Sequence, residues 1–387
     1  MESSARERDR EDFADAASGR RLTGAGAPPS REAFRRFIDE HVRPRIATGR
    51  VPLDREIYAA LGRAGFYHSS HPTSAGGYAD RHATLGALTE LGESCLPGFS
   101  FWVHGEIFCS LLLNHAPPAL RDRYGSACLA GDCIGCIGLT EAGGGSSLTA
   151  IAATAEETSA GYALSGHKRF VSLGGCADVM IASAKRAGEM APSLYLVDLK
   201  TPGVTITAVR NSFAMRELDM AHVSLDNVPV PFDHVLVRNA TFPLIRTLTL
   251  ERFICSVIAQ AMLRRVVAGA IDHLKRHRVG GAALMSYQTM RFEASRQVAQ
   301  MRSVELLVAD EAAKYLAGDR ISPEAAATCK LQAVNALKEA AAFLVSIHGA
   351  RGVVGDDAKL GLLNDAFAQA TYGGTTEVML ELIGNAL

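Results

Sequence analysis

The sequence predicts an α+β fold in which a small β domain lies between two helical domains. Apolar residues recur at helical spacing before residue 130 and after residue 242, and short β-type runs fill the region between them. Aromatic residues make up only 6% of the 387 residues while Ala and Gly are plentiful, which favours closely packed helices. At roughly 150 residues per domain, the length suits two or three packed units.

The first 30 residues are expected to form a disordered tail, because charged residues dominate them and few apolar groups are available for burial. Arg20-Arg21 is not followed by an apolar stretch, so we expect no secretion signal. No run of roughly 18 apolar residues occurs, so no membrane span is expected either.

Charge and cysteine content narrow the class of protein further. Forty Lys+Arg against 41 Asp+Glu give a formal net charge of −1, so no bulk field favours nucleic acid or an anionic membrane. Eight Cys in a chain of this length indicate reduced thiols rather than a disulfide scaffold. We therefore expect a cytoplasmic protein.

The N-terminal helical domain is predicted to span residues 31–132. Phe34, Phe37, Ile38 and Val42 share one face of its first helix. The predicted helices are Arg31–Ile46, Leu53–Ala64 (with Gly65 as C-cap), Ala83–Cys95, Pro97–Asn114 and a last one from Pro117 to Leu129.

A compact antiparallel sheet or barrel is predicted for residues 133–240. Its β-type runs begin at Tyr162, Val179, Leu194 and Val204, and Gly, Pro and Asn residues separate them.

Residues 241–387 return to helical spacing and are predicted to form a C-terminal helical bundle. Apolar residues from Ile254 to Leu274 make one stripe on a long helix. Further helices are expected at about 284–317, 323–348, 357–370 and 375–385.

Several common enzyme signatures are absent from the sequence. It contains no G-x-G-x-x-G, no G-x-x-x-x-G-K-[ST], no H-E-x-x-H and no G-x-S-x-G. Cys133-Ile-Gly-Cys136 is a C-x-x-C, but no second Cys or His pair follows at zinc-ribbon spacing. We interpret the two residues as core thiols and expect no metal site.

A glycine-rich segment, Ile137–Ser147, ends a predicted strand in a loop whose backbone N–H groups can approach a planar or anionic ligand. This loop resembles the "TEPGAGSD" segment of the acyl-CoA dehydrogenase family of flavoproteins. Leu164–Gly175, Val223–Pro231 and the Asn364–Thr375 region resemble that family's next motifs, in the same order. The resemblance runs from about residue 31 to the end, and implies a middle β-barrel-like domain and a C-terminal four-helix bundle.

The resemblance also implies an enzyme that uses FAD to oxidise an acyl thioester between its α and β carbons. The positions that match the family's flavin contacts are Leu139, Thr140, Phe170, Ser172, Gln288 and Thr375. The positions that match contacts to the substrate are Ser146, Arg252 and Tyr372.

The catalytic base is expected at an alternative position. Most family members carry a Glu in the motif "YEGT", where this chain has Gly373. A minority, including the isovaleryl-CoA and long-chain enzymes, carry it in "LER" at the start of the long helix, where this chain has Leu250-Glu251-Arg252. We therefore predict Glu251 as the general base. The backbone N–H of Gly373 remains available to stabilise the enolate-like charge.

Departures from the family pattern concern the far end of FAD. His277, Gly280 and Ser346 replace an Arg, a Phe and a Gln there. In these departures the sequence resembles divergent family members that serve biosynthetic clusters. The expected substrate is therefore an acyl thioester on CoA or on an acyl carrier protein. The resemblance implies an electron-transfer flavoprotein or O2 as the electron acceptor. The resemblance implies a homodimer or homotetramer. A flavin-dependent monooxygenase on the same fold, or a non-catalytic member, remain as alternatives.

Overall fold

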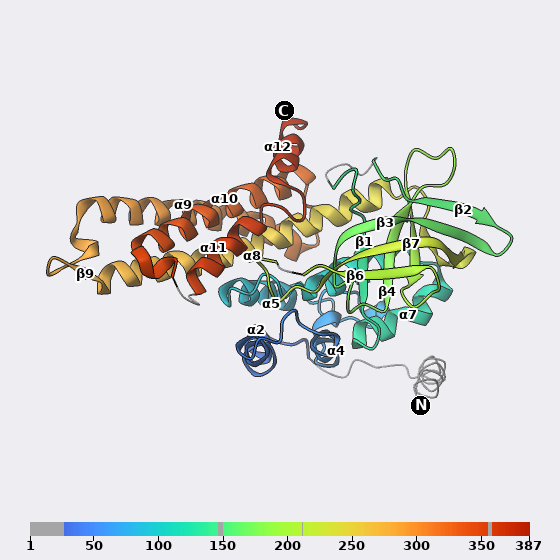
Figure 1. Cartoon of the computed structure of the whole chain (residues 1–387), viewed down its shortest axis with the longest axis horizontal. Coiled ribbons are helices and arrows are strands. Elements are labelled where there is room, and N and C mark those ends of the chain that lie inside the picture. Colours follow the sequence, from blue (N-terminus) through green and yellow to red (C-terminus); the bar gives the residue numbers. More distant parts are fainter. Residues whose placement is uncertain (1–26, 146–149, 211, 355–357) are drawn as a thin grey trace.

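The computed structural model describes residues 27–145, 150–210, 212–354 and 358–387. Strands gather at one end of the molecule, and long C-terminal helices extend away from them (Figure 1). The N-terminal helices lie along one side of this arrangement. The helical, β and helical order predicted from the sequence is confirmed. The predicted tail lies almost wholly outside the described residues.

The N-terminal part is helical, but two of its predicted helices are interrupted by π-helical turns. The segment predicted as one helix from Arg31 consists of α2 (Arg31–Phe37), a π turn (Ile38–Val42) and α3 (Arg43–Ala47). The predicted helix from Pro97 becomes helical only at Phe101 and includes a π turn. The other elements are α4 (Arg55–Arg63), α5 (Arg81–Glu93), the second π turn (Val103–Phe108), α6 (Cys109–His115) and α7 (Pro118–Ala130).

The β domain contains two four-stranded sheets. One has the order β1 (Gly135–Gly138), β4 (Val179–Ala184), β5 (Ser193–Asp198) and β8 (Val235–Val237). The other has the order β2 (Thr154–Thr158), β3 (Gly161–Ser172), β7 (Met220–Pro231) and β6 (Val204–Ala208). The prediction of an antiparallel sheet or barrel was wrong at one pair, because β1 runs parallel to β4. The chain crosses through β2 and β3 between them, and a crossover of that kind returns a strand in the same direction.

The C-terminal helices pack around α8 (Thr241–Arg276). They are α9 (Gln288–Ala317), α10 (Pro323–Ile347), α11 (Ala358–Ala368) and α12 (Thr376–Gly384), with a small hairpin, β9 (Arg278–Val279) and β10 (Ala282–Ala283), between α8 and α9. By length and composition α8 could cross a membrane, but 72% of its apolar window is buried inside the protein. It is therefore the core helix of the bundle.

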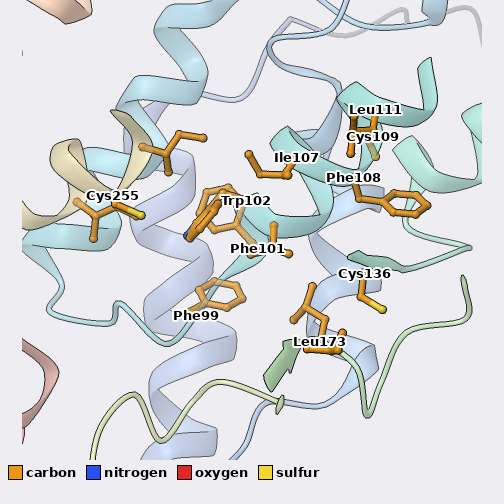
Figure 2. Packing of buried hydrophobic residues seen from close by; sticks show 14 of the residues in the cluster. Phe99, Phe101, Trp102, Ile107, Phe108, Cys109, Leu111, Cys136, Leu173 and Cys255 are labelled. Carbon is orange, nitrogen blue, oxygen red and sulfur yellow. The ribbon is translucent and has the colours of Figure 1, made fainter. Parts of the chain in front are cut away.

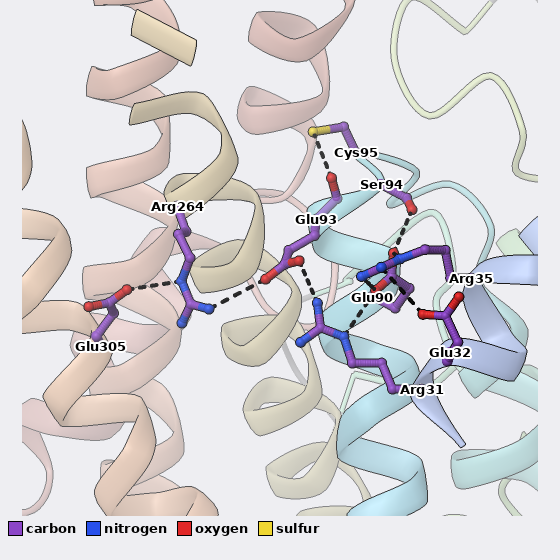
Figure 3. Close-up of polar contacts among 9 residues, drawn as sticks. All are labelled: Arg31, Glu32, Arg35, Glu90, Glu93, Ser94, Cys95, Arg264 and Glu305. Carbon is purple, nitrogen blue, oxygen red and sulfur yellow. Dashed lines mark hydrogen bonds and ion pairs between the residues drawn. The ribbon is translucent and has the colours of Figure 1, made fainter. Parts of the chain in front are cut away.

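Close contacts join the N-terminal helices to α8 and position its first half. A Cβ at Gly92 on α5 would lie 2.4 Å from the carbonyl oxygen of Ile258, so only glycine allows the two helices to approach this closely. An ion-pair network also links α2, α5, α8 and α9 (Figure 3). Arg31 and Arg35 both contact Glu90 at 2.9 Å. Arg264 lies 3.0 Å from Glu305.

Candidate functional site

A cavity of about 590 Å³ lies where the three parts of the chain meet. Its walls come from the segment around Trp102, the end of β1, the end of β3, the loop before β7, the first half of α8 and the turn before α12. The predicted residues that line it are Leu139, Thr140, Phe170, Ser172, Glu251, Tyr372, Gly373 and Thr375. Leu139 of the β domain and Thr375 of the C-terminal helical part are 236 residues apart in the sequence, yet both line this cavity.

A larger, more open recess of about 900 Å³ lies elsewhere, between the N-terminal part and the β domain. Arg55 pairs there with Asp178 at 2.8 Å, and Arg50 lies 3.4 Å from Asp54. The recess contains none of the predicted site residues. We therefore place the functional site in the smaller cavity.

A buried ion pair holds the glycine-rich loop against the β domain. Glu141 follows Thr140 and binds the ammonium group of Lys168, which also donates to the hydroxyl of Ser183 at 3.0 Å. The carboxylate of Glu141 accepts a hydrogen bond of 2.6 Å from the backbone N–H of Ala152. Burial lowers the pKa of Lys168 and the carboxylate of Glu141 opposes that effect. The pair closes the base of the loop and so fixes the end of β1.

Phe170 projects into the cavity from an irregular part of β3. Its φ of 54° lies in the left-handed region, and the pairing of β3 with β7 shifts register between Lys168 and Val171. Such a bulge redirects one side chain out of the regular alternation. The ring is 55% exposed and contacts His222 edge-on at 5.0 Å. An aromatic face is therefore available to a planar ligand.

Glu251 and Gly373 lie beside each other in the lining of the cavity. A Cβ at Gly373 would lie 3.6 Å from Cγ of Glu251 and 3.2 Å from Sγ of Cys255. The φ of Gly373 is +62°. Burial raises the pKa of the Glu251 carboxyl, and the nearby charges of Lys330 and Arg252 oppose this shift. The cavity thus presents a carboxylate whose affinity for a proton is increased.

Lys330 of α10 supports the turn that contains Gly373, and it was not among the residues predicted for the site. Its ammonium group donates to the backbone carbonyls of Tyr372 and Gly374. The signal was present in the sequence, because Lys330 falls on the buried face of α10 between Ala327 and Ala333. A lysine in such a position needs specific partners.

Of the aromatic residues near the cavity, some pack only in the hydrophobic core and others line the cavity. Figure 2 shows Phe99, Phe101 and Trp102 in one cluster, with Trp102 on the side of Cys255. Phe99 is fully buried, stacks on Phe34 and does not line the cavity. Trp102 does line it and stacks on Tyr372 at 6.5 Å.

Two of the predicted residues that the structure describes do not line the cavity. Arg252 is buried behind the Gly373 turn, and its Nε has no hydrogen-bond partner within the described segments. Gln288 begins α9, at the end of the bundle remote from the strands (Figure 1), so this chain does not bring it to the cavity. Ser146 lies outside the described residues. Cys133 and Cys136 are buried thiols, as interpreted from the sequence.

Comparison with family models gives three matches that together cover most of the chain. Residues 30–132 match the acyl-CoA dehydrogenase N-terminal domain, residues 136–228 the middle domain and residues 244–387 the C-terminal domain.

Individual relatives agree with these matches. The mitochondrial long-chain specific acyl-CoA dehydrogenase of Mus musculus is 24% identical, with 92% of this chain and 85% of that protein covered. The crystal structure of an acyl-CoA dehydrogenase from Geobacillus kaustophilus is 23% identical, with a TM-score of 0.86 over 92% of this chain and 96% of that one. A glutaryl-CoA dehydrogenase from Mycobacterium smegmatis, solved in complex with FADH2, is 23% identical with a TM-score of 0.82, over 92% of each chain.

Proposed function

This chain belongs to the acyl-CoA dehydrogenase family, and from that premise we propose that Glu251 removes the α-proton of an acyl thioester bound in the cavity. The protein is an oxidoreductase that acts on CH–CH bonds and uses FAD. The proposal concerns how this particular chain carries out that reaction and on which kind of thioester.

The residues of the cavity fit a flavin ring. The half-exposed face of Phe170 provides a stacking surface, and the hydroxyls of Thr140 and Ser172 line the same wall. Neither hydroxyl has a hydrogen-bond partner inside the described ranges, so both are available to polar edges of a ligand. Gly144 and Gly145 leave the rim beside Thr140 free of side chains. Leu139, Thr140, Phe170, Ser172 and Thr375 would therefore hold the ring.

The reaction needs a proton acceptor and a hydride acceptor on the same substrate. Bound FAD would supply the acceptor for the β-hydrogen and its electron pair. The α-proton goes to the carboxylate of Glu251, and the electrons of the broken α-C–H bond form the new double bond. Burial favours the protonated form of Glu251, which makes its carboxylate a stronger base than an exposed glutamate.

The observation that carries the assignment of Glu251 is its position beside Gly373. A side chain at residue 373 would begin within van der Waals distance of the Glu251 side chain. The carboxylate of Glu251 can therefore occupy the region where other family members place the carboxylate of a glutamate at the position of Gly373. Gly373 keeps its backbone N–H, and we assign that group to the thioester carbonyl, where it would stabilise developing negative charge.

The substrate tether, electron acceptor, compartment and assembly are further parts of the proposal. We propose an acyl-CoA or an acyl carrier protein thioester, with an electron-transfer flavoprotein or O2 as acceptor, in the cytoplasm. The position of Gln288 supports a homodimer or homotetramer. Gln288 matches a flavin contact of the family but lies away from the cavity of its own chain, so it could contact flavin only in the cavity of a second copy.

Anaerobic flavin bleaching tests the reaction and the tether together. The FAD-loaded protein is mixed without O2 with a set of acyl-CoA thioesters and with the same acyl groups on a carrier protein, and loss of flavin absorbance is followed. We expect bleaching by at least one thioester, followed by recovery with an electron acceptor. No bleaching by any of them, with FAD bound, would contradict the dehydrogenation.

Substitution of the base tests the assignment of Glu251. Glu251→Gln keeps the size of the side chain but removes the proton acceptor, so bleaching should slow by a factor of about 10² or more. Glu339→Gln, an exposed glutamate of α10, is the matched control and should bleach at the wild-type rate. Full-rate bleaching of Glu251→Gln would overturn the assignment of the base. Oxygen-dependent product formation in that variant would favour a monooxygenase instead.

A further inference from the structure

Lys330 is a buried lysine whose hydrogen bonds go to the catalytic turn rather than to an acidic side chain. Burial lowers the pKa of its ammonium group, and the nearby Cys255 and Glu251 oppose this shift. It is 2% exposed and lies on the face of α10 that packs against the 370–374 segment. Its ammonium group donates hydrogen bonds to two backbone carbonyls, those of Tyr372 and Gly374. It forms no ion pair with any described acidic residue. The turn itself thus provides its hydrogen-bond acceptors.

The two carbonyls flank Gly373 and so determine how its N–H points. The carbonyl of Tyr372 and the N–H of Gly373 belong to the same peptide group. That group is trans, because the single cis bond among the described residues is Val51-Pro52. In a trans peptide the C=O and N–H point in opposite directions. With the carbonyl bound to Lys330, the N–H is directed to the other side of the turn.

The Gly373 N–H is also free for a ligand. No hydrogen bond from it to any described residue is formed, and Gly373 lines the cavity while Lys330 does not. A cation bound to the carbonyl draws electron density through the peptide group and makes its N–H a stronger donor. The geometry therefore separates the two roles, with Lys330 behind the turn and the donor in front of it.

Lys330 also affects Glu251 through space. A methyl-sized group at Gly373 would lie 3.5 Å from Nζ of Lys330 and 3.6 Å from Cγ of Glu251, so both side chains border the same point. The charged or titratable groups that face this point are Lys330 from α10, Glu251, Arg252 and Cys255 from α8, and Tyr372 from the turn. The charge of Lys330 is thus one of two positive charges near the carboxylate.

We propose that Lys330 is a positioning residue that aims and polarises the Gly373 N–H and holds Glu251 ready to accept a proton. This inference rests on the proposed function. Burial raises the pKa of Glu251, and the positive charge of Lys330 is the first of the effects that lower it again. Removing that charge should raise the pKa of Glu251 further, so the base becomes protonated at a higher pH.

Three variants of Lys330 separate its charge from its hydrogen bonds. Lys330→Met removes both, Lys330→Gln removes the charge but keeps N–H donors, and Lys330→Arg keeps the charge. For Lys330→Met and Lys330→Gln, we expect the acidic limb of the pH profile of flavin bleaching to move up by roughly one to two pH units. Lys330→Met should also slow bleaching on the plateau by about 10-fold to 100-fold, because the donor loses its orientation.

The controls distinguish positioning from loss of fold. Lys338→Met, on the same helix, replaces a lysine that contacts Asn335 and Phe367, and should leave the limb in place. Lys330→Arg should restore the position of the limb. Each variant is checked by circular dichroism and by its flavin spectrum. If Lys330→Met does not fold, Lys330→Gln and Lys330→Arg still give the comparison.

A direct titration keeps this inference separate from the proposed function. Infrared difference spectra between the FAD-loaded protein and Glu251→Gln report the carboxyl of Glu251 without any substrate. We expect its apparent pKa to be higher in Lys330→Gln than in the protein with Lys330. An unchanged pKa together with an unchanged pH limb would overturn the inference, even if wild-type bleaching occurs. Absence of bleaching in the wild type would instead overturn the proposed reaction.

Discussion

Replacing Gly373 with alanine tests the juxtaposition on which the site depends. The new Cβ would be 3.2 Å from Sγ of Cys255, closer than about nine in ten Cβ contacts in proteins, and 3.6 Å from Cγ of Glu251. The residue would also have to hold a φ of +62°, which costs roughly 1–2 kcal/mol for an L-residue. Overpacking adds about 1–3 kcal/mol. We therefore expect a loss of roughly 2–5 kcal/mol in the free energy of unfolding.

The matched control is Gly281→Ala. Gly281 has a φ of +83°, but nothing lies within 4 Å of its Cβ position. This variant should lose only the conformational part, about 1–2 kcal/mol. The difference between the two variants isolates the contact with Cys255 and Glu251.

The assays are thermal unfolding of the FAD-loaded proteins and the rate of anaerobic flavin bleaching. Gly373→Ala should unfold at a lower temperature than Gly281→Ala. It should also bleach at least about 10-fold more slowly, because displacement of a catalytic group by even 1 Å is costly. Equal unfolding temperatures and a wild-type bleaching rate for both variants would refute the inferred contact between residues 373 and 251.

Two further predictions concern the flavin surface and the ion pairs between helices. Phe170→Ala removes the exposed stacking face, so FAD should dissociate more readily, measured as flavin released on gel filtration, and Phe232→Ala, another exposed aromatic, is the control. Glu90→Gln tests the network of Figure 3. Burial tends to raise the pKa of Glu90, but hydrogen bonds from Arg35 and Arg31 lower it overall. This lowered pKa contributes stability above the ordinary value of 4.5, and the contribution is lost as the pH falls through the folded-state value. The wild type should therefore unfold at a higher temperature than Glu90→Gln at pH 7, and this advantage should shrink in acid.

The order of the domains could be predicted because it depends on local pattern. A change from a repeat of about 3.6 residues to short β-type runs is visible in any window of the chain. The end of the helix before Gly65 was also predicted from local pattern. The C-cap is Ala64, and Gly65, directly after it, has the left-handed φ of +84° that such a helix end requires. The π turns at Ile38–Val42 and Val103–Phe108 could not be predicted, because an apolar stripe looks nearly the same whether one residue is added or not.

The parallel pairing of β1 with β4 was not predicted, for a different reason. Sequence runs indicate strands but not their partners, and pairing is decided by the path of the chain between them. β1 meets β4 only after the chain has built β2 and β3 in the second sheet. The exposed ring of Phe170 likewise depends on a register shift against β7, which a single strand does not reveal.

By itself the sequence determined the fold class, the family and most residues of one cavity, because motif residues at strand ends and helix starts are properties of the linear chain. Only the tertiary structure decided which residues meet. It brought Glu251 beside Gly373, kept Arg252 and Gln288 out of the cavity lining, and placed Lys330 behind the catalytic turn. The physical reason is that burial and electrostatic coupling depend on distance through space. The packing of α8 and α10 sets that distance, and the separation of residues along the chain does not.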